Sequence, residues 1–388
     1  MRLLHTSDWH LGRTLHGVDL LDAQAAVLGE IVRLVAEPPD GIAVDAVIVA
    51  GDVYDRAVPP VEAVALFART LAELAAHSTV IVSSGNHDSA IRLGFGSRLF
   101  TDRIRLRTDL AEVGTPVLLG PAEAPVAIYP LPYLDPDSAR LALGADGEPL
   151  ARSHQAVMSA AMDRVRADLA GRPGHRCVVV AHAFVVGGLA SDSERSIAVG
   201  GVDSVAADTF AGADYVALGH LHGAQQPRTA TDAVLAYSGS PLRYSFSELG
   251  HTKSVNLVDL PPAGRATVTA VPLAQPREMA VLTGTLAELL AVDGYTEHWL
   301  SVTLTDRARP DRPIDRLRAR FPQLLHVEFA PAGLAPAYPS AQLPVTERNP
   351  RELAADFIAH VTGLPAAADE LELFAQAYDT ALAEASAG

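Results

Sequence analysis

The stretch TVIVSSGNHDSA, residues 79–90, runs a β-branched apolar segment directly into Gly85, Asn86, His87 and Asp88. An unbroken apolar run of this kind is typical of a strand buried on both faces, as in parallel sheets. Asn, His and Asp are metal-binding side chains, and in βαβ architecture ligands gather where strands end at their carboxyl edge. The stretch therefore predicts an α/β protein with a polar site at one edge of its sheet.

Similar apolar strands alternate with helical patterns over the first two-thirds of the chain. Helices are predicted near Leu21–Glu37 and Pro60–Ala76, between the apolar runs RLLHTSD, AVIVAGD and TVIVSSG, and this order is typical of βαβ units. We therefore predict an α/β (α+β) fold of two sheets flanked by helices. Its further strands are expected in VAIYPLP (126–132), CVVVAHA (177–183), DYVALGH (214–220), AVLAYSGS (233–240) and SVNLVDL (254–260).

The remaining third differs in pattern. Residues 260–275 read as a last strand followed by a linker, and HWLSVTLTD, DRPIDRLRARFP and LLHVEFAP then predict a small strand, helix, strand domain. Residues 331–350 are rich in proline and predict an extended connector, and two amphipathic helices follow near 350–363 and 367–387. The predicted domains are 1–274, 275–343 and 344–388.

Composition limits what the chain can do alone. With 388 residues, 49% of them hydrophobic, it can bury one large core and still form a smaller domain. Its net charge of -16 argues against a free-standing, non-specific nucleic-acid binder, although bound divalent metals or a partner subunit can supply positive charge. Cys177 is the single cysteine and is expected to be a packed strand thiol. The chain shows neither a signal peptide nor a membrane span, so a cytoplasmic protein is expected.

Five short motifs place metal-binding side chains directly after predicted strands. Asp8 and His10, like His220 and His222, are two residues apart, and such pairs point to the same side of an extended backbone. Oxygen and imidazole ligands without thiolates suit Mn, Fe, Zn or Co, and Asp52 is the natural bridge between two ions about 3.5 to 4 Å apart. A single motif of this kind is more often an ordinary turn. Five of them, each after a predicted strand, are hard to explain as turns. The motifs are SDWHLG (7–12), AGDVYD (50–55), GNHD (85–88), VAHA (180–183) and GHLH (219–222).

In this order the motifs resemble those of the calcineurin-like metallophosphoesterase superfamily, over about the first two-thirds of the chain. Within it, HTSDWHLG, GDVYDRAVPP, SGNHDS, YVALGHLH and YSGSPLRYSFSE are similar to the SbcD family, the nuclease subunits of bacterial SbcCD complexes. The resemblance implies two Mn²⁺ ions, other divalent metals being alternatives. It implies that Asp8, His10, Asp52 and His222 hold one ion, and that Asp52, Asn86, His182 and His220 hold the other.

The resemblance also implies roles for the next two residues. His87 would contact the scissile phosphate or protonate the leaving oxygen, which suits the near-neutral intrinsic pKa of an imidazole. Asp88 would orient His87 by accepting a hydrogen bond, or would instead cap the following helix. Asp55 stands where archaeal relatives have a second histidine, although bacterial members commonly have Asp there, and it is left without a catalytic role.

The family acts on DNA ends and hairpins, as a 3' to 5' double-strand exonuclease and a single-strand endonuclease in DNA repair, recombination and replication. The resemblance implies a homodimer through Pro59–Ala76 and Ile91–Phe100, and docking of the terminal helices on the SbcC ATPase. These segments could instead pack on their own domains. Other functions left open are hydrolysis of small phosphodiesters or phosphoproteins, and a DNA-end tether with a vestigial metal site.

Two further features are expected near the substrate. The small, polar loop VVGGLASDSERSIAVGG, residues 185–201, is expected to be mobile. Four arginines near the motifs could reach DNA phosphates or could simply be solvated surface. They are Arg13, Arg56, Arg92 and Arg243.

Overall fold

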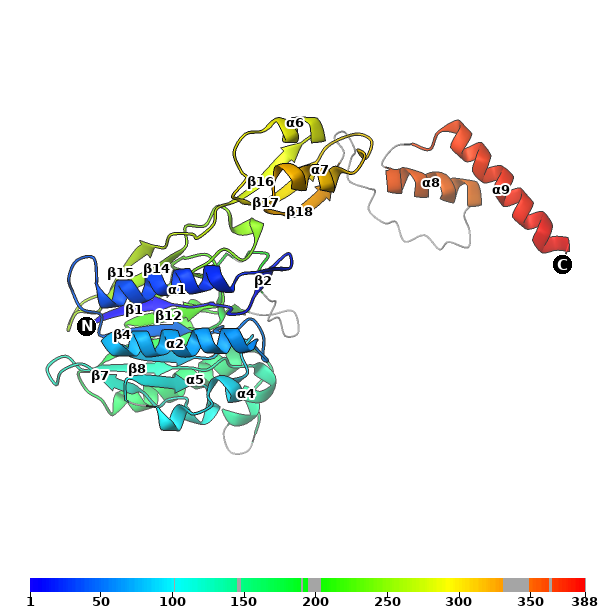
Figure 1. The fold of residues 1–388 in the computed structure, drawn as a ribbon. Coiled ribbons are helices and arrows are strands. Elements are labelled where there is room, and N and C mark those ends of the chain that lie inside the picture. Colours follow the sequence, from blue (N-terminus) through cyan, green and yellow to red (C-terminus); the bar gives the residue numbers. More distant parts are fainter. Residues whose placement is uncertain are drawn as a thin grey trace. The chain divides into compact units, whose positions relative to one another are not determined.

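The computed structural model of the 388-residue chain divides it into two units, Met1–Ala280 and Val281–Gly388 (Figure 1). Our domain boundary after residue 274 stays a prediction, and the one after residue 343 lies outside the described residues. The structure describes residues 1–100, 102–144, 148–189, 191–194, 204–330, 349–362 and 365–387.

The first unit contains a six-stranded sheet in the order β15-β14-β1-β4-β5-β6. Strands β1, β4, β5 and β6 are parallel, whereas β14 is antiparallel to both β1 and β15. The carboxyl ends of β1, β4 and β5 therefore lie at one edge. The strands are β1 (Arg2–Thr6), β4 (Ala46–Ala50), β5 (Thr79–Ser83), β6 (Ile104–Arg107), β14 (Ser254–Asp259) and β15 (Thr267–Pro272).

A five-stranded sheet in the order β13-β12-β9-β8-β7 forms the second half of this unit. Its strands β8, β9, β12 and β13 are parallel, and β7 is antiparallel to β8. The ends of β9 and β12 thus share an edge as well. The strands are β7 (Val117–Leu119), β8 (Val126–Pro130), β9 (Arg176–His182), β12 (Tyr215–Gly219) and β13 (Val234–Tyr237).

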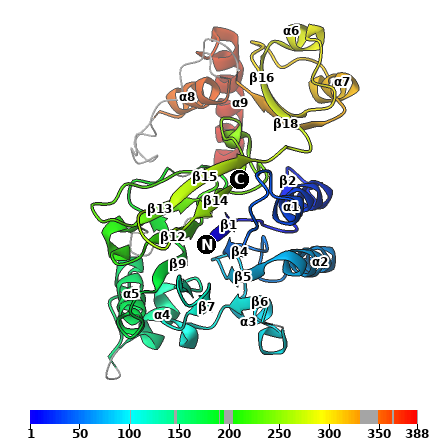
Figure 2. The ribbon, with the colours of Figure 1, turned by 90° about the vertical axis from the view of Figure 1, so that its left-hand side faces the viewer.

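Helices cover the outer face of each sheet, α1 (Leu21–Ala36) and α2 (Val61–His77) on the first, α4 (Pro136–Ala142) and α5 (His154–Ala170) on the second (Figure 2). Along β4, Val47 and Val49 pack toward α1 and α2, while Ala46, Ile48 and Ala50 pack between the two sheets. This double burial explains the unbroken apolar runs of the sequence. The predicted fold class, two sheets flanked by helices, is confirmed.

Short elements connect these layers and lie mostly in the loops beside the strand ends. They are β2 (Thr14–Leu15), β3 (Val18–Asp19), α3 (Ala90–Leu93), η1 (Ser97–Leu99), η2 (Leu110–Glu112), β10 (Phe184–Val185), β11 (Ser204–Val205), η3 (Ala207–Phe210) and η4 (Phe246–Glu248).

The later part of the chain has a three-stranded sheet, β16-β17-β18, in which β17 and β18 are parallel. The predicted strand, helix, strand order is present, and β16 and α6 add to it. Two terminal helices also form, close to the predicted ranges, and the proline-rich connector lies almost entirely outside the described residues. The elements are β16 (Met279–Gly284), α6 (Leu286–Ala291), β17 (Trp299–Leu304), α7 (Pro313–Arg320), β18 (Leu324–Phe329), α8 (Pro350–Thr362) and α9 (Ala368–Ala387). None of the helices in the described ranges is long and apolar enough to cross a membrane.

Candidate metal centre

The carboxyl ends of β1, β4, β5, β9 and β12, together with the loops that follow them, carry the five motifs and meet at one place. Four of their residues have left-handed backbone, at φ 54° for Asp8, 43° for His10, 50° for Asp52 and 105° for His220. Such backbone is costly for residues with a side chain and is concentrated at functional sites. The loops are therefore shaped to aim particular side chains inward.

The carboxylate of Asp52 lies at the centre of this region. Its Oδ2 is 3.4 Å from Nε2 of His182, 3.6 Å from Nε2 of His10 and 3.8 Å from Nε2 of His87. Its Oδ1 accepts a hydrogen bond of 2.9 Å from the backbone N–H of His87. Asp52 is only 2% exposed, so one buried carboxylate faces imidazoles from the ends of three other strands or the loops after them.

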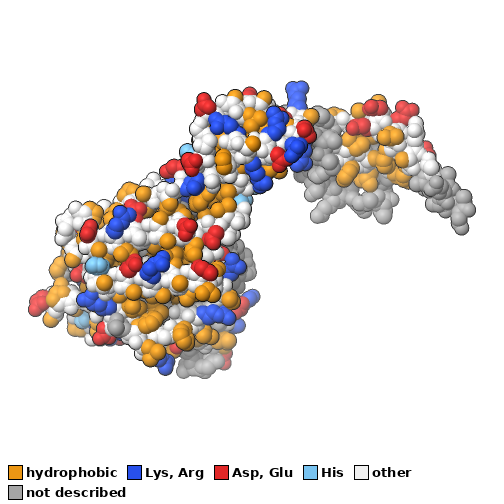
Figure 3. Space-filling model, viewed as in Figure 1, with side chains coloured by type: hydrophobic (Ala, Val, Ile, Leu, Met, Phe, Trp, Pro, Cys, Tyr) orange, Lys and Arg blue, Asp and Glu red, His pale blue; other side chains and the backbone are white. Residues whose placement is uncertain are grey.

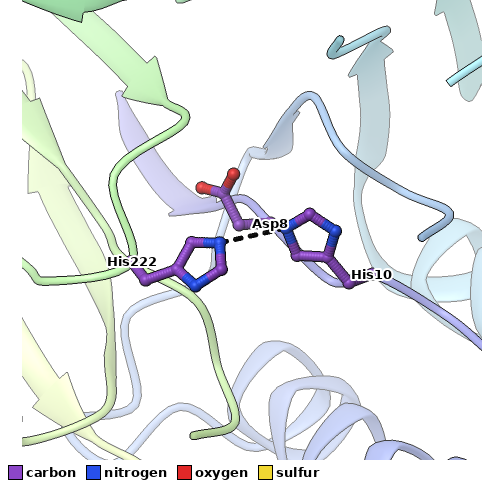
Figure 4. Close-up of side chains that lie close together, drawn as sticks. All are labelled: Asp8, His10 and His222. Atoms are coloured by element: carbon purple, nitrogen blue, oxygen red, sulfur yellow. Dashed lines mark hydrogen bonds between the residues drawn. The ribbon is translucent and has the colours of Figure 1, made fainter. Parts of the chain in front are cut away.

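Asp8, His10 and His222 form one group of potential ligands beside it (Figure 4). One donor atom from each of the three lies within 4.8 Å of the others, and the Nε2 atoms of His10 and His222 are 3.0 Å apart. Both carboxylate oxygens of Asp8 accept from the backbone N–H of His220 at 3.1 Å. The Nε2 atoms of His10 and His222 and the carboxylate of Asp8 thus lie close together, although they follow two different strands, β1 and β12.

His182, Asn86 and His220 belong to the same site. Nε2 of His182 lies 3.0 Å from Oδ1 of Asn86, and donor atoms of Asp8, Asp52 and His182 lie within 4.8 Å of one another. The rings of His182 and His220 have their centroids 5.4 Å apart. All seven side chains that the resemblance implied as ligands are therefore brought together.

The donor set fits divalent cations. It consists of carboxylate, amide oxygen and imidazole, with two buried carboxylates to balance the charge of the ions. Nδ2 of Asn86 is buried and lacks a hydrogen-bond partner within the described part of the chain, which leaves Oδ1 as the atom held toward His182. The side chains present therefore fit a site for divalent cations, and the assignment of each ligand to an ion stays a prediction.

Burial and charge set the protonation of the group. Burial raises the pKa of Asp8 to about 6. For Asp52 burial acts in the same direction, but the charge and hydrogen bond of His182 and the nearby His10 hold its pKa well below the usual range. For His182 burial alone would lower the pKa, but the charge of Asp52 outweighs it and raises the pKa to about 9. Burial keeps the pKa of His10 well below its usual value and lowers that of His220 to about 3. At neutral pH in the metal-free protein, Asp52 is therefore ionised and His182 protonated, whereas His10 and His220 are neutral.

His87 and Asp88 are held differently from one another. Nδ1 of His87 lies 2.7 Å from the carbonyl oxygen of Asp55, which leaves Nε2 on the Asp52 side. The Asp88 carboxylate accepts from the backbone N–H groups of Val53 (3.1 Å), Tyr54 (2.9 Å) and Gly85 (2.9 Å). These contacts do not support our prediction that Asp88 orients His87. They show a carboxylate that ties the loop after β4 to the loop after β5.

The alternative interpretation of Asp88 as a helix cap is wrong. The N-cap of α3 is Ser89, whose side chain accepts from the backbone N–H of Arg92. Burial, together with the charge of Asp52, raises the pKa of Asp88 to about 7, while its backbone hydrogen bonds oppose that shift.

Sequence reasoning missed the residues that support the ligands. Gln24 of α1 is buried, and its Nε2 donates to the carbonyl oxygens of His10 (2.7 Å) and Trp9 (3.2 Å). The hydroxyl of Tyr244 also donates to the carbonyl oxygen of Trp9. Glu248, with no exposed surface, lies 3.1 Å from Nδ1 of His222 through Oε1. A polar residue within the otherwise apolar side of a predicted helix was the one signal available for Gln24.

The candidate DNA-contacting arginines differ in exposure. Arg13 is mostly buried, donates from Nη2 to the carbonyl oxygen of Ser193 at 2.9 Å and lies over the ring of Tyr244. Arg243 pairs with Glu278 at 3.1 Å. Arg56 and Arg92 are exposed.

The loop after His182 is described only in part. Residues 190 and 195–201 of the stretch expected to be mobile lie outside the described residues. The described segment Ser191–Glu194 contacts the centre, because Oε1 of Glu194 accepts from the backbone N–H of His222 at 2.7 Å.

Comparison with known proteins agrees with this geometry. The calcineurin-like phosphoesterase family model matches residues 1–224, and a model described as the type 5 capsule protein repressor C-terminal domain matches residues 275–362. The SbcD subunit of the nuclease SbcCD from Bacillus subtilis is 35% identical over 356 residues, covering 84% of this chain and 85% of the relative. Its counterpart from Staphylococcus epidermidis is 29% identical over 332 residues, covering 84% of each. The chain therefore belongs to the SbcD family of calcineurin-like phosphoesterases, as its motifs predicted.

Proposed function

We propose that the chain is a manganese-dependent DNA nuclease subunit that hydrolyses phosphodiester bonds with two metal ions. The observation that carries this proposal is the Asp52 carboxylate, which faces the imidazoles of His10, His87 and His182 within 3.8 Å. When bound, the ions would polarise the phosphate and lower the pKa of water. The first ion would be held by Asp8, His10, Asp52 and His222, and the second by Asp52, Asn86, His182 and His220.

His87 is the residue best placed to act on the substrate itself. The carbonyl oxygen of Asp55 can only accept a hydrogen bond, so Nδ1 of His87 carries a proton and donates it there. Nε2 is left to face the centre. A protonated Nε2 can contact the scissile phosphate or give its proton to the leaving oxygen. Gln24 and Tyr244, which hold the backbone of Trp9 and His10, keep the neighbouring ligands in place.

DNA ends and hairpins are the proposed substrates, cleaved by 3' to 5' exonuclease and single-strand endonuclease activity in repair, recombination and replication. Support comes from the relatives, which are named as SbcD subunits of the nuclease SbcCD. The net charge of -16 does not prevent this, because bound cations and a partner can supply positive charge. On the face shown in Figure 3, basic and acidic side chains are interspersed. We place this activity in the cytoplasm, where bacterial DNA lies.

Exposed apolar side chains support the proposed homodimer. Val61 at the start of α2 is 78% exposed, and in and around α3 and η1 Ile91, Phe95 and Leu99 are 88%, 83% and 87% exposed. A group of large apolar side chains left in water is typical of an interaction surface. We propose that these residues, the α2–η1 surface, pair two copies of the chain.

The terminal helices α8 and α9 are proposed to dock on the SbcC ATPase. Phe357 of α8 is 65% exposed and Leu373 of α9 is 69% exposed. Amphipathic helices commonly bind by laying such residues into an apolar groove of a partner. The relatives are by name subunits of an SbcCD complex, which supports this choice of partner.

One experiment tests the nuclease proposal. The purified chain is incubated with manganese and labelled blunt duplex or hairpin DNA, beside bis-p-nitrophenyl phosphate, with and without the ATPase. We expect DNA cleavage that His87→Asn lowers about 100-fold or more with both ions still bound, since this is the usual contribution of a proton donor.

The matched control is His77→Gln, because His77 is exposed at the end of α2, two residues before β5 begins and away from the carboxyl edge. It should leave cleavage unchanged. Hydrolysis of the small ester alone, even with the ATPase present, would favour the small-phosphodiesterase alternative. DNA binding without any hydrolysis would favour the tether, and loss of both ions in His87→Asn would refute the role of His87.

A further inference from the structure

A buried ion pair lies directly behind His222 and outside the set of proposed ligands. Glu248 has no exposed surface and Lys253 is 3% exposed, and Nζ of Lys253 contacts Oε2 of Glu248. Nζ also donates to the carbonyl oxygen of His222 at 2.9 Å and to Oγ of Ser240 at 2.8 Å. A buried ion pair often contributes less to stability than apolar side chains of the same volume would. Stability alone therefore does not account for the pair of Glu248 and Lys253.

The two ring nitrogens of His222 face different environments. Nδ1 is 3.1 Å from Oε1 of Glu248 and 2.8 Å from Oγ of Ser193, whereas Nε2 is 3.0 Å from Nε2 of His10. An ionised carboxylate only accepts hydrogen bonds, and a neutral imidazole carries one N–H. The proton of neutral His222 is therefore drawn to Nδ1, and the lone pair of Nε2 is left facing the centre.

Glu248 is held in its ionised form by its neighbours. The ammonium group of Lys253, itself buried, contacts Oε2 and balances the negative charge of the carboxylate. The backbone N–H of Tyr244 also donates to Oε2, at 3.3 Å. Both oxygens of the carboxylate thus have fixed partners, so its position is fixed as well.

We propose that Glu248 is the positioning residue of His222, which it holds with Nδ1 protonated and Nε2 directed at the metal. The inference rests on the metal site of the proposed function. A carboxylate that accepts from the second nitrogen of a metal-bound histidine fixes its tautomer and ring orientation, and removing such a partner lowers metal affinity about 10- to 100-fold.

The same carboxylate holds the segment Ser191–Glu194 against the centre. The hydroxyl of Ser193 contacts Oε1 of Glu248, and Oγ of Ser191 lies 2.9 Å from Oγ of Ser193. Glu194 accepts from the backbone N–H of His222. Loss of the Glu248 carboxylate should therefore loosen this segment as well as the imidazole.

Two double variants test the proposal without leaving a buried charge unpaired. Glu248→Gln with Lys253→Met keeps an oxygen that can accept from Nδ1 of His222. Glu248→Leu with Lys253→Met removes it at nearly the same volume. Manganese affinity is measured by calorimetry, and hydrogen exchange reports on the segment Ser191–Glu194.

We expect the Gln variant to bind manganese within a few-fold of the wild type. The Leu variant should bind about 10- to 100-fold more weakly and exchange faster in the segment. Equal affinities in the two folded variants would overturn the proposal, because a purely structural pair would affect both alike. If the wild type bound no divalent metal, the proposed function would fail first.

A spectroscopic measurement on the wild type keeps the proposal testable even if the Leu variant does not fold. The metal-free protein is labelled with ¹⁵N-histidine. The signals of His222 are assigned as those that disappear in His222→Gln, and their ¹⁵N chemical shifts distinguish the two neutral tautomers. We expect the proton on Nδ1. A proton found on Nε2 would refute the role of Glu248.

Discussion

Gly85 and Gly51 let the loops after β5 and β4 approach each other without a side chain between them. A Cβ on Gly85 would collide with the carboxylate and backbone nitrogen of Asp52, and one on Gly51 would collide with the ring of His182. Such collisions with buried, fixed groups cannot be relieved by a side-chain rotation. The position of the central carboxylate therefore depends on two residues that have no functional group of their own.

Replacing Gly85 by Ala should therefore displace Asp52. We expect a loss of about 1 to 3 kcal/mol in the free energy of unfolding, and weaker manganese binding. Denaturant unfolding and calorimetry check both. The matched control is Gly29→Ala in α1, where a Cβ meets nothing within 4 Å and where alanine should stabilise the helix by up to about 1 kcal/mol. Unchanged metal binding in Gly85→Ala would contradict the central place of Asp52.

The protonation of His182 predicts how metal affinity depends on pH. In the metal-free protein its pKa is raised to about 9, so at pH 7 to 8 the ring must lose a proton before it can bind an ion. Below that pKa, the affinity for manganese should increase about tenfold for each unit by which the pH is raised. Below pH 6 the slope should steepen, because the raised pKa of Asp8, about 6, adds a second proton. Manganese titrations between pH 5.5 and 9 check this, and an affinity independent of pH would contradict it.

At the scale of elements, much of the centre follows from the sequence. Each strand that leads to the site is buried along almost its whole length, and the motif at its carboxyl end names the side chains delivered to the shared edge. Supporting residues could not be predicted in this way. Gln24, Glu248 and Lys253 act across long sequence separations, and their partners depend on how α1, η4 and β14 pack around the loops.

The predicted hydrogen bond from His87 to Asp88 lacks support for a related reason. Its position next to His87 in the sequence suggested a contact between the two side chains. The loop instead turns the carboxylate toward the backbone of Val53 and Tyr54, which follow another strand. Proximity along a tight loop says little about side-chain direction when the loop packs against a second one.

A single charged substitution tests whether the α2–η1 surface pairs two copies of the chain. Phe95→Glu places a carboxylate among exposed apolar side chains and should convert a dimer into a monomer, because burying an unpaired charge at an interface is costly. Sedimentation or light scattering measures the mass. Leu118→Glu is the matched control, since Leu118 is 50% exposed on β7 of the second sheet. A wild-type monomer at high concentration would contradict the proposed homodimer.

At the scale of the whole molecule, catalysis and partner binding are assigned to separate parts of the chain. The ligands all precede residue 223, and the proposed docking helices begin at Pro350. This separation predicts that one function can be lost without the other.

Phe357→Glu in α8 should abolish co-purification with the SbcC ATPase while hydrolysis of bis-p-nitrophenyl phosphate stays unchanged. Phe357 is 65% exposed, so the substitution should not disturb folding. Pull-down and a spectrophotometric assay measure the two effects. Retained co-purification would mean that the partner binds elsewhere.

The first strand, β1, is central in its sheet and pairs with β14, where Arg2 lies opposite Asp259. A nascent polypeptide leaving the ribosome therefore cannot complete this sheet until some 260 residues have been synthesised. Asp8 and His10, which follow β1, are translated early but gain fixed positions late. The metal centre therefore cannot be complete on a chain whose synthesis has not yet reached β14.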